Sequence, residues 1–246
     1  MGTSTARSGR NAPRSSDWRR ARTRVTRLAR GTGSSVAGAV GAFAYAVSGS
    51  NGDGRTGGGG RMASSVRVGQ ALGSFLGSTA SSGLDQTLRS IGLGDLVGAT
   101  PYSVLSGVAD YICGSNGLLD DAIARSAAVE TLAVIFDESD DTYADLRGRW
   151  ENQLGPDRVV DLLSLFLSQA IHQRFLLELG EKLEASAVSA SHAERMEDKV
   201  FVFIRAMVVF ELGEMNPLTF DWQGSAGKEL IERNLTAALG QLEAYV

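Results

Sequence analysis

Apolar side chains recur every three or four residues along most of this 246-residue chain, and this helical period restricts its fold more than any other feature. Leu84, Leu88 and Ile91 share one helical face, for example, and later segments repeat the spacing. The two-residue alternation that is typical of half-buried strands is scarce. The sequence therefore predicts an all-α fold, a helical bundle with a flexible basic N-terminal arm.

Capping residues and apolar spacing set the expected helix boundaries. Together they predict helices over residues 18–29, 36–47, 101–113, 120–133, 156–187 and 225–244. Ser191 and Glu194 have the spacing of a capping box that would open one more helix. That helix contains residues 200–210, which are apolar nearly all round, so we expect it at the buried centre.

Composition divides the chain into four segments. Residues 1–16 have almost no apolar side chains and are predicted to form a disordered tail. Residues 17–47 contain an arginine-rich helix and a helix of small residues, and residues 48–60 are a glycine-rich linker. The remaining segment, residues 61–246, is predicted to form an all-helical domain.

The pattern is helical again from Arg61, and Gly69, Gly73 and Gly77 lie at every fourth position of this segment. An interior glycine costs about 1 kcal/mol relative to alanine, so some contact should offset the three. We expect close approach of another helix, with residues 36–47 as the candidate because they hold small residues at the same spacing. A kinked or frayed segment is the alternative.

Charge is distributed unevenly along the chain. Residues 1–67 hold 12 arginines and two aspartates, a net charge of +10, whereas residues 68–246 hold 12 basic and 26 acidic residues, a net charge of −14. The basic part can fold back onto the acidic body, or it can bind nucleic acid or an acidic partner. Candidate partner-binding residues in the first helix are Trp18, Arg19, Arg20, Arg22, Arg24 and Arg27.

Motifs that carry catalysis are missing from the sequence. The glycine-rich linker lacks the Lys-Ser/Thr ending of a phosphate-binding loop. A calcium loop that begins at Asp137 would have Thr142 in place of its glycine and Gly148 in place of its glutamate. Cys113 and His172 have no partner at relay or ligand spacing. We therefore expect a protein that is not an enzyme and holds no metal or cofactor.

The location of the protein is predicted from three features. No apolar run approaches the roughly 20 residues of a membrane span, so no membrane partner is expected. The arginine-rich start, with Arg19-Arg20 and the later Ala44-Tyr45-Ala46, allows an export or import signal as an alternative. A single cysteine fits a reducing compartment, and we expect a cytoplasmic protein.

The first residues offer a reactive amine. Removal of Met1 exposes Gly2, and the first lysine is Lys182. An α-amino group titrates near 7.7 to 8.0, so about a third of it is neutral and nucleophilic at pH 7.5, against roughly 0.1% of a lysine. Gly2 has no side chain to hinder attack on an activated carboxyl group. N-myristoylation is disfavoured because Ala6 replaces the usual Ser or Thr.

Four stretches follow one another in a distinctive order: MGTS, DWRRARTRVTRLARG, GGGGRMASSVRVGQALGSFLG and VADYICGSNGLLDDAIARSAAVETL. Over roughly the first 135 residues they resemble the QatB family of the four-component Qat anti-phage system. The resemblance implies three partners: a QueC-like enzyme (QatC), an ATPase (QatA) and a TatD-like nuclease (QatD). It also implies that the QueC-like enzyme, which would hold zinc and ATP, transfers a deazaguanine-type acyl group to Gly2, with Thr3 and Ser4 as recognition residues.

Three hypotheses for function remain open at this level. The leading one is a non-catalytic defence subunit that presents Gly2 to the QueC-like partner. The alternative is a nucleic-acid-binding adaptor that uses the arginine-rich N-terminal helix. A third is a scaffold whose arm only tethers the ATPase.

Overall fold

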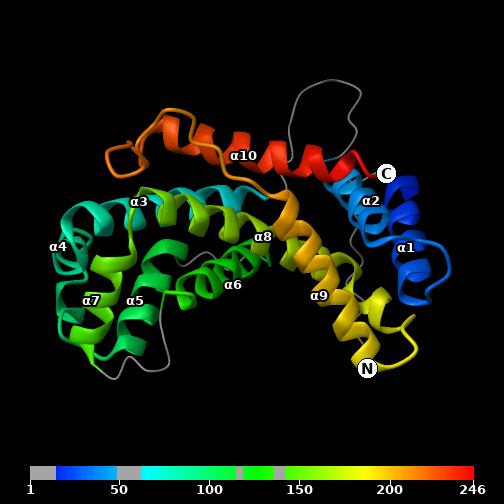
Figure 1. Cartoon of the computed structure of the whole chain (residues 1–246), viewed down its shortest axis with the longest axis horizontal. Helices are drawn as coiled ribbons and strands as arrows, with labels where there is room; N and C mark the ends of the chain where they lie inside the picture. Colours follow the sequence, from blue (N-terminus) through cyan, green and yellow to red (C-terminus); the bar gives the residue numbers. More distant parts are fainter. Residues whose placement is uncertain (1–14, 49–61, 115–118, 136–141) are drawn as a thin grey trace.

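A computed structural model describes residues 15–48, 62–114, 119–135 and 142–246, and in these residues all the regular structure is helical (Figure 1). The all-α prediction is confirmed. The helices are α1 (Ser15–Ala29), α2 (Val36–Ser48), α3 (Ala63–Ser82), α4 (Leu84–Ser90), the 3-10 helix η2 (Gly94–Leu96), α5 (Pro101–Cys113), α6 (Leu119–Ala133), α7 (Tyr143–Gln153), α8 (Pro156–Glu184), α9 (Ala190–Met207) and α10 (Ser225–Glu243).

Local capping chemistry explains several helix starts. The Thr100 hydroxyl accepts a hydrogen bond from the Ser103 amide at 3.3 Å, and prolines open α5 and α8, as predicted. The predicted capping box of α9 is wrong by two residues. Ser189 caps that helix instead, because its hydroxyl accepts from the His192 amide at 3.2 Å.

The long helix α8 forms the centre of the molecule. It packs against α1, α3, α6 and α9, and one continuous hydrophobic cluster joins α1 and α2 to the rest of the described chain. Figure 1 shows α4, α5 and α7 at one end and α1, α2 and α9 at the other. The predicted tail and linker fall largely outside the described residues, although Ser16 lies in α1 and Ser48 in α2.

The expectation that residues 200–210 form the buried centre is wrong. Val200 and Ile204 are fully buried, but Val202 is 65% exposed and Val209 is 57% exposed. The helix ends at Met207 and lies at one end of the molecule (Figure 1), so its neighbours cover only part of its surface. The central place belongs to α8.

The glycines of α3 do permit close contact, but the predicted partner is wrong. A Cβ on Gly73 would lie 2.5 Å from Cε3 of Trp222, and one on Gly77 would lie 2.7 Å from the Pro217 carbonyl oxygen. The segment before α10 therefore fills this space. Instead, α2 contacts the end of the chain, where a Cβ on Gly41 would lie 2.9 Å from the Leu242 carbonyl oxygen.

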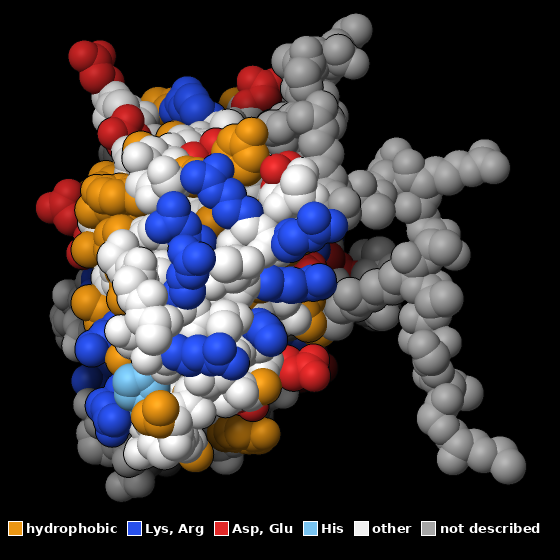
Figure 2. Space-filling view, turned by 90° about the vertical axis from the view of Figure 1, so that its right-hand side faces the viewer, with side chains coloured by type: hydrophobic (Ala, Val, Ile, Leu, Met, Phe, Trp, Pro, Cys, Tyr) orange, Lys and Arg blue, Asp and Glu red, His pale blue; other side chains and the backbone are white. Residues whose placement is uncertain are grey.

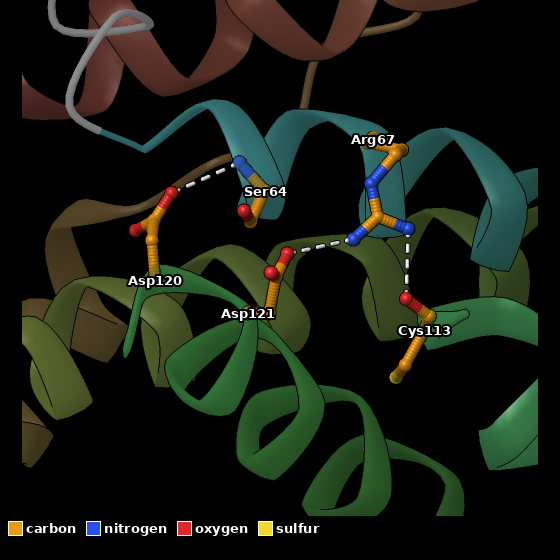
Figure 3. Close-up of polar contacts among 5 residues, drawn as sticks. All are labelled: Ser64, Arg67, Cys113, Asp120 and Asp121. Carbon is orange, nitrogen blue, oxygen red and sulfur yellow. Dashed lines mark hydrogen bonds and ion pairs between the residues drawn. The ribbon is translucent and has the colours of Figure 1, made fainter. Parts of the chain in front are cut away.

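The start of α3 is tied to α5 and α6 by polar contacts (Figure 3). The Ser64 amide donates to the Asp120 carboxylate at 3.0 Å, which caps α3 from another helix because α3 has no side-chain cap of its own. The Arg67 guanidinium donates to the Cys113 carbonyl at 2.8 Å and to Asp121 at 2.9 Å. These contacts fix the orientation of α3 in the bundle.

Candidate functional site

Helix α1 is anchored in the core by one apolar stripe. Trp18 is 8% exposed, Ala21 and Val25 are fully buried, and Leu28 is 6% exposed. The Trp18 ring meets Phe43 of α2 edge-on at 6.3 Å between ring centroids. Because that spacing follows the helical period, the stripe leaves the opposite side of α1 facing the surface.

The C-terminal end of α1 has its own anchor. The His192 ring, in the first turn of α9, lies with its Nε2 atom 3.1 Å from the carbonyl oxygen of Ala29. Carbonyls in the last turn of a helix lack partners within the helix, so this contact satisfies one of them. Both ends of α1 are therefore fixed relative to the bundle.

Six arginines cover the outward surface of α1. Arg24 is half-buried beside Gly38 and the others are exposed; the set is Arg19, Arg20, Arg22, Arg24, Arg27 and Arg30. Figure 2 looks at this end of the molecule and shows Lys and Arg side chains gathered across its centre. Within the described parts of the chain, none of the six forms an ion pair. Their charge is available to an anionic ligand.

The arginines line two shallow grooves. The larger, of about 650 Å³, lies between α1 and α8 and is called here the basic groove; its lining residues are Arg19, Arg22, Thr23, Thr26, Arg27, Arg30, Thr32 and Lys182. The smaller, of about 400 Å³, lies on the other side of the Arg19–Thr23–Arg27 ridge and is lined by Ser16, Arg19, Arg20, Thr23, Arg24 and Arg27. Both grooves present guanidinium groups to solvent.

The threonines of the basic groove supply no hydrogen-bond donor to a ligand. The Thr23 hydroxyl donates to the Arg19 carbonyl and the Thr26 hydroxyl to the Arg22 carbonyl, each at 2.9 Å. With their protons used in this way, these hydroxyls face a ligand only as acceptors. The strong donors of the groove are its guanidinium groups and the Lys182 ammonium, which suit phosphate or carboxylate oxygens.

A groove of opposite charge lies where α8 ends and α9 begins. It has a volume of about 440 Å³, and its acidic lining residues are Glu184, Glu194 and Glu197. Burial and the neighbouring carboxylates of Glu184, Asp198 and Glu194 raise the pKa of Glu197 above its usual value. An anion is therefore attracted to the α1 surface and repelled from this one.

The structure brings five of the predicted site residues together, namely Arg19, Arg20, Arg22, Arg24 and Arg27. It does not place Trp18 among them, because that side chain lies in the core. Gly2, Thr3 and Ser4 lie outside the described residues. Sequence reasoning missed Lys182, whose position 152 residues beyond Arg30 gives no local signal that it would lie beside α1.

Cys113 and His172, the other candidate groups considered in the sequence, both lie in packed surroundings. Cys113 is 3% exposed, and burial raises the pKa of its thiol, which disfavours the reactive thiolate. The His172 ring packs on Phe201 at 5.2 Å between centroids, and burial lowers its pKa. In the residues that the structure describes, no His, Cys, Asp or Glu cluster is arranged to hold a metal ion.

None of the described helices has both the length and the apolar character of a membrane span. The acidic stretch 137–145 lies partly outside the described residues, and its later part enters α7, where Thr142 and Asp145 form a capping box.

Comparison with known proteins gives one result. A protein-family model described as Qat anti-phage system associated protein QatB matches residues 54–242, more than three quarters of the chain. The match covers α3 to nearly the end of α10, whereas α1 and α2 precede it. Searches of curated proteins and of solved structures each found no match. The chain belongs to the QatB family, and it is a component of an anti-phage defence system.

Proposed function

We propose that this chain is the non-catalytic subunit that presents Gly2 to a QueC-like partner for attachment of a deazaguanine-type group. The observation that carries the proposal is the anchoring of α1, which starts at Ser15, 13 residues after Gly2. Thirteen residues span at most about 45 Å when extended. Gly2 can therefore enter a pocket of another protein while α1 stays packed on the bundle.

The chemistry suits a glycine amine. The partner uses ATP to activate a carboxylate, and the neutral Gly2 nitrogen attacks the activated carbonyl carbon. An amide bond forms, the group installed by ATP leaves, and the nitrogen loses a proton. The lysine nearest in sequence is Lys182, which belongs to α8, so the arm offers no competing amine.

The α1 surface supplies the docking contacts in this proposal. Arg19, Arg20, Arg22, Arg24 and Arg27 would bind acidic groups of the partner, since they are unpaired within the described chain. Thr3 and Ser4 would lie beside the reacting Gly2, at the entrance of the partner's pocket. To Trp18 we assign the anchoring of α1, because it is buried. The ATPase and the nuclease would join the same assembly.

Mass spectrometry tests the proposal. The chain is co-expressed with its QueC-like partner or with a catalytically inactive version of it, and the intact mass first establishes that the mature chain begins at Gly2. The N-terminal peptide should then carry the added group only with the active partner. An unmodified Gly2 in that sample refutes the proposal.

A shortened arm provides a sharper control. Deleting residues 5–14 keeps Gly2, Thr3 and Ser4 but joins them directly to Ser15, which reduces the extended reach from about 45 Å to about 10 Å. We expect the modification to disappear while the thermal unfolding midpoint is unchanged, because the deleted residues precede the packed stripe of α1. Full modification of the shortened chain would contradict the proposal that the length of the arm carries Gly2 into the partner's pocket.

The unpaired basic groove favours a second candidate function, a nucleic-acid-binding adaptor. Binding to phosphates releases counterions, so affinity should fall steeply with salt. A gel-shift assay at two ionic strengths tests this function. If no nucleic acid binds at the lower ionic strength, the adaptor function is excluded.

A further inference from the structure

We infer that the basic groove holds the phosphodiester backbone of a nucleic-acid duplex without reading its bases. This inference rests on the second candidate function and deepens it. It names the cations that contact phosphate, which include Lys182, a residue that the sequence did not single out. It also names the form of nucleic acid that the groove accepts.

The groove has the length and the charge for such a strand. From Arg19 to Arg30 α1 rises by about 16 Å. Each strand of a duplex carries one phosphate per about 3.4 Å of its axis, so about five phosphates fit beside this length when the strand follows α1. The groove has five cations, which are Arg19, Arg22, Arg27, Arg30 and Lys182.

The groove is built from two helices, which distinguishes it from an ordinary charged helix surface. Three of its cations come from α1, Arg30 directly follows that helix, and Lys182 comes from the last turn of α8. The stripe from Trp18 to Leu28 and the contact between His192 and Ala29 fix α1 against the bundle. The backbone positions that carry the cations are therefore fixed before binding, so no helix has to be ordered when a phosphate is bound.

The lining residues favour phosphate over base contacts. Single-strand binding proteins stack bases on exposed aromatic rings, and the basic groove has none in its lining. The aromatic residue of α1, Trp18, lies in the core. The lining also lacks Asn and Gln, the side chains that pair with adenine edges. The guanidinium groups of arginine and the ammonium group of Lys182 remain. Both match phosphate oxygens, and guanine is the base edge with which they can also pair.

Fluorescence anisotropy measures the predicted contacts. The full chain is titrated against a labelled 20-base-pair duplex, and against a single strand of equal length, at several salt concentrations between 50 and 200 mM. With five phosphates neutralised, the logarithm of the binding constant should fall with the logarithm of salt at a slope of about −4.5. The affinity should therefore drop roughly 500-fold across this range.

Neutral substitutions identify the cations. Arg30→Gln and Lys182→Gln should each reduce the magnitude of the slope by about 1, and the double variant by about 2. Arg89→Gln in α4 and Arg233→Gln in α10 are matched controls, because both side chains are exposed and lie outside the groove. The controls should leave the slope unchanged, and thermal unfolding should show that all the variants fold.

Each result separates the inference from the function on which it rests. If no duplex binds at 50 mM salt, the adaptor function and the inference both fail. If duplex binds but Arg30→Gln and Lys182→Gln change nothing, the adaptor stands and the basic groove is not its site. Tighter binding of the single strand, with a preference among bases, also overturns the inference. Loss of QueC-like partner binding in these variants, without any nucleic-acid binding, assigns the groove to protein docking instead.

Discussion

Replacing Gly73 by alanine tests how α3 packs in the bundle. In an unconstrained helix interior this change stabilises a protein by about 1 kcal/mol, because alanine is the better helix former. At Gly73 the added methyl carbon would lie 2.5 Å from Cε3 of the Trp222 ring, about 1 Å closer than an ordinary contact. The sign of the effect therefore depends on whether that ring can move.

The surroundings of Trp222 oppose movement. The ring is 3% exposed, its Nε1 donates to the Pro217 carbonyl at 2.9 Å, and Phe220 meets it edge-on at 5.0 Å between centroids. Overpacking a rigid site costs about 1–3 kcal/mol, and we take the upper end because the ring is held on several sides. After the gain in helix propensity, Gly73→Ala should destabilise the fold by about 2 kcal/mol.

Gly148→Ala is the matched control. Gly148 lies in the middle of α7, and an added methyl would meet nothing within 4 Å. We expect stabilisation by about 0.5–1 kcal/mol from helix propensity alone. Thermal unfolding followed by circular dichroism should show the midpoint of Gly73→Ala about 4–8 °C lower and that of Gly148→Ala slightly higher than in the unaltered chain. Equal stabilisation by both substitutions refutes the close packing of α3 on Trp222.

Three further substitutions have effects that urea unfolding can measure. Trp18→Ala removes a buried ring and should cost about 3 kcal/mol; no change would mean that α1 is not anchored by this residue. Asp121→Asn removes the carboxylate partner of Arg67 and should cost about 1–2 kcal/mol, since the Arg67 side chain is 40% exposed and water replaces part of the contact. Burial lowers the pKa of His172 below 6.5 in the folded chain, so the unfolded chain binds the proton more readily. Stability should therefore fall as the pH drops below 6.5, and His172→Gln should reduce this dependence between pH 7.5 and 5.

Most helix positions were predictable because the signals for them are local, although α7 was not predicted and the start of α9 was misplaced by two residues. Thr100 and Pro101 open α5, Pro156 opens α8, and Gly31, with a backbone φ of +66°, follows the end of α1. The outward arginines of α1 were predictable for the same reason, since the spacing of Trp18 and its neighbours defines the buried side of the helix. Each of these features depends on residues within about one helical turn.

Contacts between distant segments were not predictable in this way. An apolar run such as residues 200–210 indicates that a helix forms, but which of its sides is covered depends on the number of neighbours it meets. Small residues in α3 indicate close approach without identifying the partner, which is the ring of Trp222. Lys182 reaches the basic groove only because α8 lies beside α1.

The division of α1 between anchoring and exposed residues makes its function open to experiment. The side chains that hold it, such as Trp18 and Val25, point into the core, and the arginines point away from it. Replacing an exposed, unpaired arginine by glutamine removes charge without opening a cavity, so stability should change by less than about 0.5 kcal/mol. A loss of binding or of phage defence in such a variant can then be attributed to the surface of α1. The same loss after Trp18→Ala would have two explanations. That change disturbs the helix that carries the arginines, and with it the attachment of the arm that carries Gly2.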